Sequence, residues 1–89
     1  MPRVELAKAF RRHVDGPPED VAGATVGEAL EAYFALHDGV RAYVLDDQGA
    51  VRKHVTVFLN DQQIADRRGL TDATGTDDEI HVFQALSGG

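Results

Sequence analysis

The sequence contains no cysteine. Disulfide bonds, zinc sites built from thiolates and a cysteine nucleophile are therefore excluded. Serine is nearly as rare, because Ser87 is the only one, and a nucleophilic serine needs a positioned base that a terminal tail does not provide. The glycine-rich phosphate-binding loop, Gly-x-x-x-x-Gly-Lys followed by Ser or Thr, is also missing. We therefore expect a protein that is not an enzyme and that uses no cofactor.

Basic residues are scarce. Nine Lys and Arg stand against fifteen Asp and Glu, which gives a formal net charge of −6. This balance argues against nucleic acid as a partner, because binding to phosphates depends on Lys and Arg. No apolar run approaches the roughly 18 residues that cross a membrane, and the first residues form no secretory signal. We expect a soluble cytoplasmic protein without a membrane partner.

Metal ligands are present only as scattered groups. His54 and His81 are expected on the solvent-facing side of neighbouring strands, but an ordinary surface pair is favoured because a metal site usually needs a third ligand and supporting groups. The acidic run Asp77–Glu79 can bind a hard cation weakly. A solvated turn explains that run better, so the sequence predicts no metal site.

One helix is clearly indicated over Val26–Asp38. Thr25 and Glu28 have the spacing of a capping box, with Thr25 as the N-cap. Apolar residues recur on one face of this segment at helical spacing. Gly39 is placed to end the helix in a left-handed conformation.

Strands are predicted on both sides of this helix. Their expected ranges are Arg3–Phe10, Glu19–Gly23, Val51–Asn60, Gln62–Ala65 and Ile80–Ala85. The segment Val40–Leu45 fits either type of element, and Asp66–Glu79 has the composition of a loop. The 89 residues suffice for one domain.

This order of elements predicts an α+β protein with the β-grasp (ubiquitin-like) fold. One main helix covers a mixed sheet whose first and last strands are parallel neighbours. The alternative, a ferredoxin-like fold, requires a second long helix that Asp66–Glu79 is too rich in Gly, Asp and Thr to form. We expect a β-grasp domain over residues 1–84 and a flexible tail over residues 85–89. The expected hydrophobic core consists of Tyr33 or Phe34, Leu30, Val55, Val57, Ile80 and Val82.

Two features of the predicted domain suit a protein that is docked and then modified. Phe58 and Phe83 are expected to point outward from one sheet face and to form a docking patch. The sequence ends in Ser87, Gly88 and Gly89, and a Gly-Gly end has no side chains, so it can thread a narrow channel. Extended, residues 84–89 reach about 20 Å at ~3.3 Å each.

Several segments together resemble the ThiS/MoaD family of small sulfur-carrier proteins. They are Thr25–Leu30, Val55–Ile64, Gly69-Leu70, Asp77–Ile80 and Ala85–Gly89. The resemblance covers most of the chain. One departure is Gln84-Ala85, where many relatives have proline.

The resemblance implies that a ubiquitin-activating-type enzyme uses ATP to adenylate the carboxylate of Gly89. A sulfurtransferase then supplies sulfur, Gly89 becomes a thiocarboxylate, and the sulfur passes to a biosynthetic enzyme. Gly88, Ser87, Leu86, Phe83 and Phe58 would contact these partners, and the free protein would be a monomer.

Three alternatives stay open. The protein can be a ubiquitin-like modifier conjugated through Gly89, a small subunit of a molybdopterin-synthase-type complex, or a plain binding module.

Overall fold

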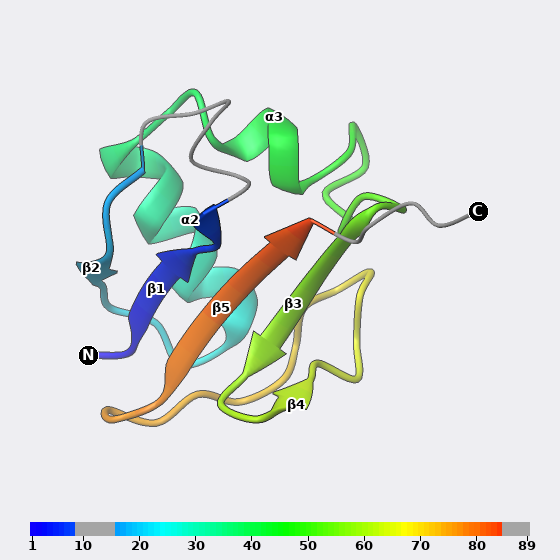
Figure 1. Ribbon diagram of the computed structural model, residues 1–89. Coiled ribbons are helices and arrows are strands. Elements are labelled where there is room, and N and C mark those ends of the chain that lie inside the picture. Colours follow the sequence, from blue (N-terminus) through cyan, green and yellow to red (C-terminus); the bar gives the residue numbers. More distant parts are fainter. Residues whose placement is uncertain (9–15, 85–89) are drawn as a thin grey trace.

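The structure is a computed structural model that describes residues 1–8 and 16–84. Five strands form one mixed sheet in the order β2-β1-β5-β3-β4, and helix α2 lies across one face of it (Figure 1). The elements, in chain order, are β1 (Arg3–Leu6), β2 (Glu19–Asp20), α2 (Val26–Leu36), α3 (Arg41–Val44), β3 (Val55–Leu59), β4 (Gln62–Gln63) and β5 (Glu79–Gln84).

The centre of the sheet is built from β1, β5 and β3. β1 pairs parallel with β5, so that Val4 lies opposite Ile80. β3 pairs antiparallel with β5, so that Val57 lies opposite Val82. The first and last strands are therefore parallel neighbours, as the sequence predicts, and the fold is a β-grasp.

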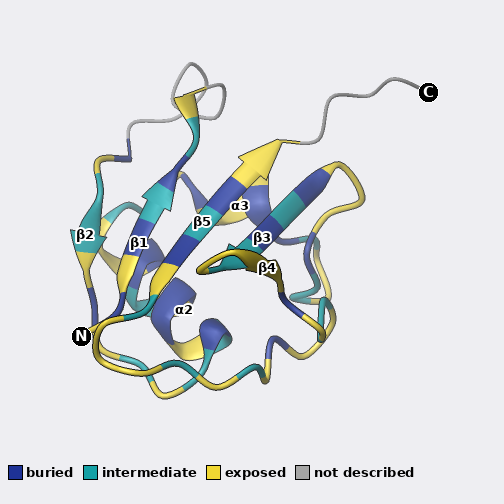
Figure 2. Ribbon diagram, turned by 60° about the horizontal axis from the view of Figure 1, so that its bottom comes forward, coloured by how far each residue is buried: buried dark blue, intermediate teal, exposed yellow. Residues whose placement is uncertain are grey.

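Burial alternates along the central strands (Figure 2) because successive side chains of a strand point to opposite faces. Every residue of the predicted core is buried, and both Tyr33 and Phe34 belong to it. The Tyr33 side chain is completely buried, and its hydroxyl donates to the backbone oxygen of Pro17 at 2.9 Å. One hydrophobic core therefore joins α2 to the sheet.

Helix α2 begins as predicted and ends earlier than predicted. The backbone N–H of Glu28 donates to the Thr25 hydroxyl at 3.1 Å, and the Glu28 carboxylate accepts from the N–H of Ala24 at 2.9 Å. The helix ends at Leu36, not at Asp38, with His37 as its C-cap. The expected left-handed Gly39 is wrong, because the chain continues through a right-handed turn into α3 and needs no reversal there.

Several strands are shorter than the sequence suggests. β1 stops at Leu6, and the predicted end at Phe10 lies outside the described residues. β3 starts at Val55 and not at Val51, because residues 53–54 form a turn. β5 runs over Glu79–Gln84, whereas Ala85 lies outside the described part. The ambiguous segment before β3 forms α3.

The predicted loop of residues 66–79 is held by aspartate side chains. The Asp66 carboxylate accepts from the Thr71 hydroxyl at 2.7 Å and from the N–H of Gly69 at 2.8 Å. These hydrogen bonds hold the pKa of Asp66 below its ordinary value of 3.8, and the one from the Thr71 hydroxyl has the largest effect. In the same way the N–H of Gly75 lowers the pKa of Asp78. Within residues 1–8 and 16–84, neither helix is long and apolar enough to span a bilayer.

Candidate functional site

The two predicted docking residues lie together on the sheet face opposite α2. Phe58 in β3 and Phe83 in β5 meet edge to face, with ring centroids 5.5 Å apart and an angle of 80° between the rings. They are diagonal neighbours, since Phe58 is paired with His81 and Phe83 with Thr56. Phe83 is 41% exposed, whereas Phe58 is only half-buried and not fully exposed as predicted. Phe83 covers part of it.

A shallow hollow of about 510 Å³ surrounds this aromatic pair. It is lined by Phe58, Asn60, Asp61, His81 and Phe83. The turn after β3 supplies its polar edge, and Asn60 adopts a left-handed conformation there, with φ 56°. The arrangement combines an apolar floor with hydrogen-bonding groups, which is the composition of a protein-docking surface.

His81 links this surface to acidic side chains. Its Nε2 atom lies 3.2 Å from a Glu79 carboxylate oxygen, and its Nδ1 atom lies 3.7 Å from one of Glu5. The ring also stacks on Phe83, with centroids 6.2 Å apart and 21° between the planes. His81 thus continues the aromatic surface toward β1.

The expected pairing of His54 with His81 is wrong. His54 lies in the turn before β3, next to a strand position that faces Gln84, whereas His81 is paired with Phe58 further along β3. The strand register therefore separates them, because the residue opposite His81 lies four positions after His54. Within the described part of the chain, no three His, Asp or Glu side chains are grouped to hold a metal ion.

The remaining predicted site residues are Leu86, Ser87, Gly88 and Gly89. All four lie outside the described residues. The last described position before them is Gln84, which ends β5 and is paired with Val55 at the start of β3. The structure therefore fixes the position of the last described residue before the predicted tail.

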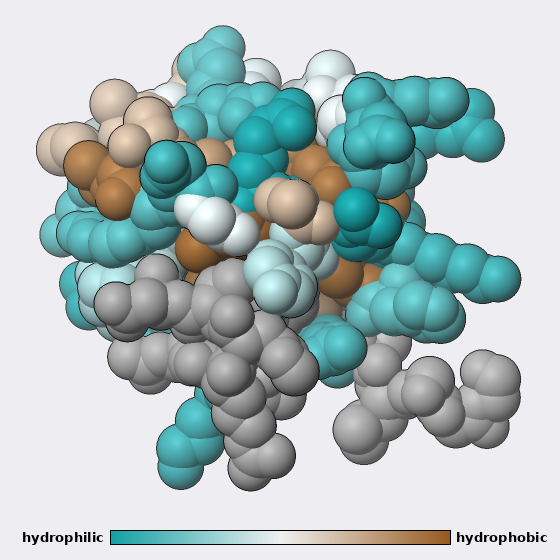
Figure 3. Space-filling model, turned by 90° about the horizontal axis from the view of Figure 1, so that it is seen from above, coloured by the Kyte–Doolittle hydropathy of each residue, from teal (hydrophilic) through white to brown (hydrophobic). Residues whose placement is uncertain are grey.

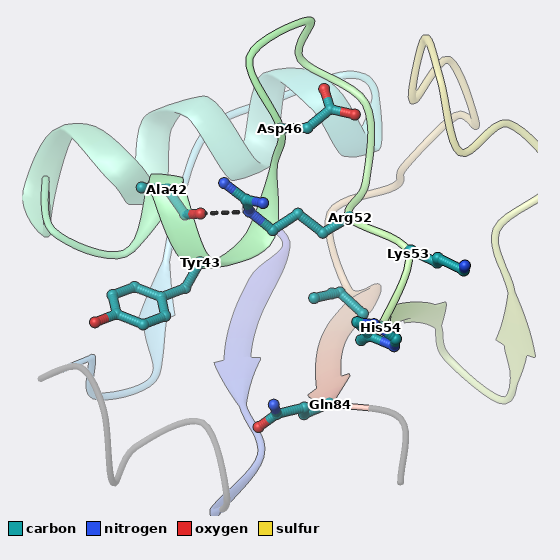
Figure 4. Close-up of a pocket in the computed structure, with 8 residues that line it drawn as sticks. Ala42, Tyr43, Asp46, Arg52, Lys53, His54 and Gln84 are labelled. Atoms are coloured by element: carbon teal, nitrogen blue, oxygen red, sulfur yellow. Dashed lines mark hydrogen bonds between the residues drawn. The ribbon is translucent and has the colours of Figure 1, made fainter. Parts of the chain in front are cut away.

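A second hollow, of about 690 Å³, adjoins that point. Figure 4 shows it between α3 and the ends of β3 and β5. Arg52, Lys53, His54 and Gln84 contribute to its lining, together with Asp46 and two residues of α3. The Arg52 Nε atom donates to the backbone oxygen of Ala42 at 2.6 Å. This surface was not predicted from the sequence, although the run Arg52-Lys53-His54 in an acidic chain was a usable signal.

Comparison with known proteins places the chain among small ubiquitin-like proteins. The sequence model of the ThiS family matches residues 9–89. Small archaeal modifier protein 1 of Haloferax volcanii is 38% identical over 93% of this chain and 84% of its own length. Small archaeal modifier protein 3 of the same organism is 33% identical, over 74% of this chain and 71% of its own length.

A further relative carries a different name. Sulfur carrier protein CysO of Mycobacterium tuberculosis is 24% identical over 97% of this chain and 96% of its own length. Among solved structures, the crystal structure of the first modifier from Haloferax volcanii superimposes with a TM-score of 0.78. It covers 99% of this chain and 98% of that protein at 31% identity. The chain is therefore similar over nearly its whole length both to proteins named modifiers and to a protein named a sulfur carrier.

Proposed function

This chain belongs to the ThiS family, and we propose that it is a ubiquitin-like protein modifier, joined through the carboxylate of Gly89 to amines of other proteins. One observation carries this proposal. The two relatives named modifiers are 38% and 33% identical to the chain, whereas the sulfur carrier is 24% identical. The residues alone favour sulfur carriage, and the relatives reverse that preference.

The chemistry begins with activation, because a carboxylate is a poor electrophile. A carboxylate oxygen of Gly89 attacks the α-phosphorus of ATP, and pyrophosphate leaves. The neutral amine of a target lysine then attacks the carbonyl carbon of the acyl-adenylate. The bond to AMP breaks, the nitrogen loses a proton, and an isopeptide bond remains. Because the reaction consumes ATP, we place the protein in the cytoplasm.

This chain is the substrate of that reaction and supplies recognition only. The aromatic pair of Phe58 and Phe83 forms the surface that an adenylating enzyme binds. Aromatic side chains commonly dominate the binding energy at interfaces. The strand β5 carries Phe83 and ends one residue later, so docking at the pair sets the position from which the tail starts. In the proposal Leu86, Ser87 and Gly88 occupy the channel of the enzyme that leads to the adenylation site.

Sulfur carriage is the second candidate. It is supported by the match to CysO over nearly the full length of both proteins. The first step is the same, and the two functions differ only in the nucleophile. Hydrosulfide, supplied by a sulfurtransferase, attacks the carbonyl carbon and displaces AMP, which leaves a thiocarboxylate on Gly89. A biosynthetic enzyme then receives the sulfur.

One experiment separates these fates. The chain, tagged at its N-terminus, is expressed in its native host beside a variant that lacks Gly88 and Gly89. Because no Lys or Arg follows Arg68, trypsin leaves residues 69–89 as a branch on a modified lysine. Chymotrypsin, which cleaves after Phe and Leu, leaves a much shorter branch that mass spectrometry identifies readily.

A modifier gives high-mass conjugates that carry this branch and that vanish in the truncated variant. A sulfur carrier gives free protein whose intact mass is higher by the difference between one sulfur and one oxygen. If the full-length chain forms no conjugates, the modifier proposal is wrong. If it also forms no thiocarboxylate, and no host enzyme exchanges pyrophosphate with ATP in its presence, activation of Gly89 is wrong as well.

A further inference from the structure

Four basic residues lie close together in the described part of this acidic protein. Arg52, Lys53, Arg67 and Arg68, which we call the cationic rim, make up four of the nine Lys and Arg of the chain. The first two precede β3 and the last two follow β4. They line two hollows, of about 690 and 520 Å³, and Lys53 lines both.

The guanidinium groups of Arg52 and Arg67 are held in place by hydrogen bonds to backbone oxygens. Arg67 donates through Nη2 to the oxygen of Arg52 at 2.8 Å and to that of Val55 at 2.7 Å. Arg52 in turn donates to the oxygen of Ala42. These neutral acceptors order the side chains and leave their positive charge in place.

Ion pairs neutralise two arginines outside the rim. Arg3 pairs with Asp20 at 3.6 Å, and Arg41 pairs with Glu31 at 3.1 Å. Within the described residues, no ion pair involves a residue of the rim. Asp46 lines both hollows and keeps its negative charge, but its carboxylate and that of Asp66 accept backbone N–H groups of their own turns and make no ion pair with the described rim residues. The rim therefore presents cations that an outside partner can pair with.

The rim also lies where a partner must come close. Gln84, the end of β5, lines the same hollow as Arg52 and Lys53. Gly89 lies five positions after Gln84, and a fully extended chain of that length spans only about 17 Å. Any enzyme that acts on Gly89 therefore has to approach the hollow within that distance.

The character of this side of the molecule favours recognition by charge. Seen from the side of α3, the visible surface is largely hydrophilic, and hydrophobic side chains appear only in small separate areas (Figure 3). In the close-up, Lys53 points away from α3 (Figure 4). Both views agree with a polar contact made by extended cationic side chains.

We propose that the cationic rim binds an acidic surface of the activating enzyme, beside the opening through which the tail reaches the adenylation site. This inference rests on the proposed activation of Gly89. The rim orients the domain over that opening, while the aromatic pair on the sheet face supplies apolar contact. Complementary charge of this kind raises the rate of encounter and fixes orientation.

The test compares two double variants with the same change in net charge. K53Q/R68Q removes the two rim cations whose side chains make no hydrogen bond to the backbone, and R3Q/R41Q removes two cations elsewhere. The full chain and both variants are used as the varied substrate in pyrophosphate exchange with the activating enzyme, at 50 mM and 500 mM NaCl. Amide NMR spectra check that each variant is folded.

At low salt we expect the KM of K53Q/R68Q to rise about five- to tenfold, and that of R3Q/R41Q to change less than twofold. At 500 mM NaCl the difference should largely disappear, because the Debye length falls to about 4 Å. Equal KM values for the two variants overturn the rim proposal and leave Gly89 activation intact. Absence of exchange with the wild-type chain overturns both. A shift from dimer to monomer in K53Q/R68Q alone assigns the rim to a second copy of this acidic chain and also overturns the proposal.

Discussion

Phe58 and Phe83 touch edge to face across neighbouring strands, 5.5 Å apart, on the side of the sheet that α2 leaves uncovered. One ring is half-buried and the other is exposed, so the half-buried ring supports the exposed one. An aromatic surface held in this way is ordered before a partner binds, and this lowers the entropic cost of binding. Phe83 lies one residue before Gln84, the last described residue at this end of the chain.

The exposed ring should matter more for binding than for stability. We expect Phe83→Ala to weaken binding to the activating enzyme by about tenfold or more, as central aromatic residues often do. Its melting temperature should stay close to that of the wild type. Leu36→Ala, which removes an exposed apolar side chain of α2, is the matched control. Isothermal titration calorimetry measures the affinity of each variant for the activating enzyme. Equal affinities would show that the aromatic pair is not part of the interface.

The buried centre of β3 should respond in the opposite way. Val57 is fully buried and faces Val82 across the strand pair. Val57→Ala removes two methyl groups and leaves a cavity, which should cost roughly 1–3 kcal/mol in the free energy of unfolding. Urea denaturation measures the loss. Thr56→Ala, on the other face of the same strand, should cost clearly less, and a larger cost there would contradict the packing described above.

The narrow end of the chain should tolerate no branched side chain. We expect Gly88→Val to block activation of Gly89, because a β-branched residue widens the chain and restricts its backbone. Pyrophosphate exchange measures the loss, and the melting temperature should be unchanged. Gly39→Val is the matched control, since a Cβ atom there meets nothing within 4 Å. Normal activation of the Gly88 variant would mean that no narrow channel is involved.

The loop after β4 should lose stability in acid. The pKa of Asp66 is lowered in the folded state, chiefly by the Thr71 hydroxyl, so its contribution is complete above the ordinary value of 3.8. That contribution is lost as the pH falls below this value toward the folded pKa. Asp66→Asn should therefore lower the melting temperature at pH 7 and flatten its decline below pH ~4. Asp77→Asn removes the same charge from the same loop and should keep the wild-type profile.

Local patterns in the sequence were enough to predict the architecture. The alternation of Val55 and Val57, and of Ile80 and Val82, assigned one face of each strand to the core, because the side-chain period of a strand is two. The capping box at Thr25 located the start of α2 for a similarly local reason. The site at the Gly-Gly ending and the two phenylalanines stays a prediction, and of these residues the structure describes only Phe58 and Phe83.

The tertiary structure decided the features that depend on distant partners. Whether a strand continues is settled by the presence of a neighbour that accepts its hydrogen bonds, so the short β1 and the late start of β3 were beyond a local pattern. The same holds for Gly39, whose conformation follows from the direction of the next helix. In the cationic rim, Arg67 donates to the backbone oxygens of Arg52 and Val55, which holds Arg67 and Arg68 beside Arg52 and Lys53. Only folding brings these pairs together, because fourteen positions of chain separate Lys53 from Arg67.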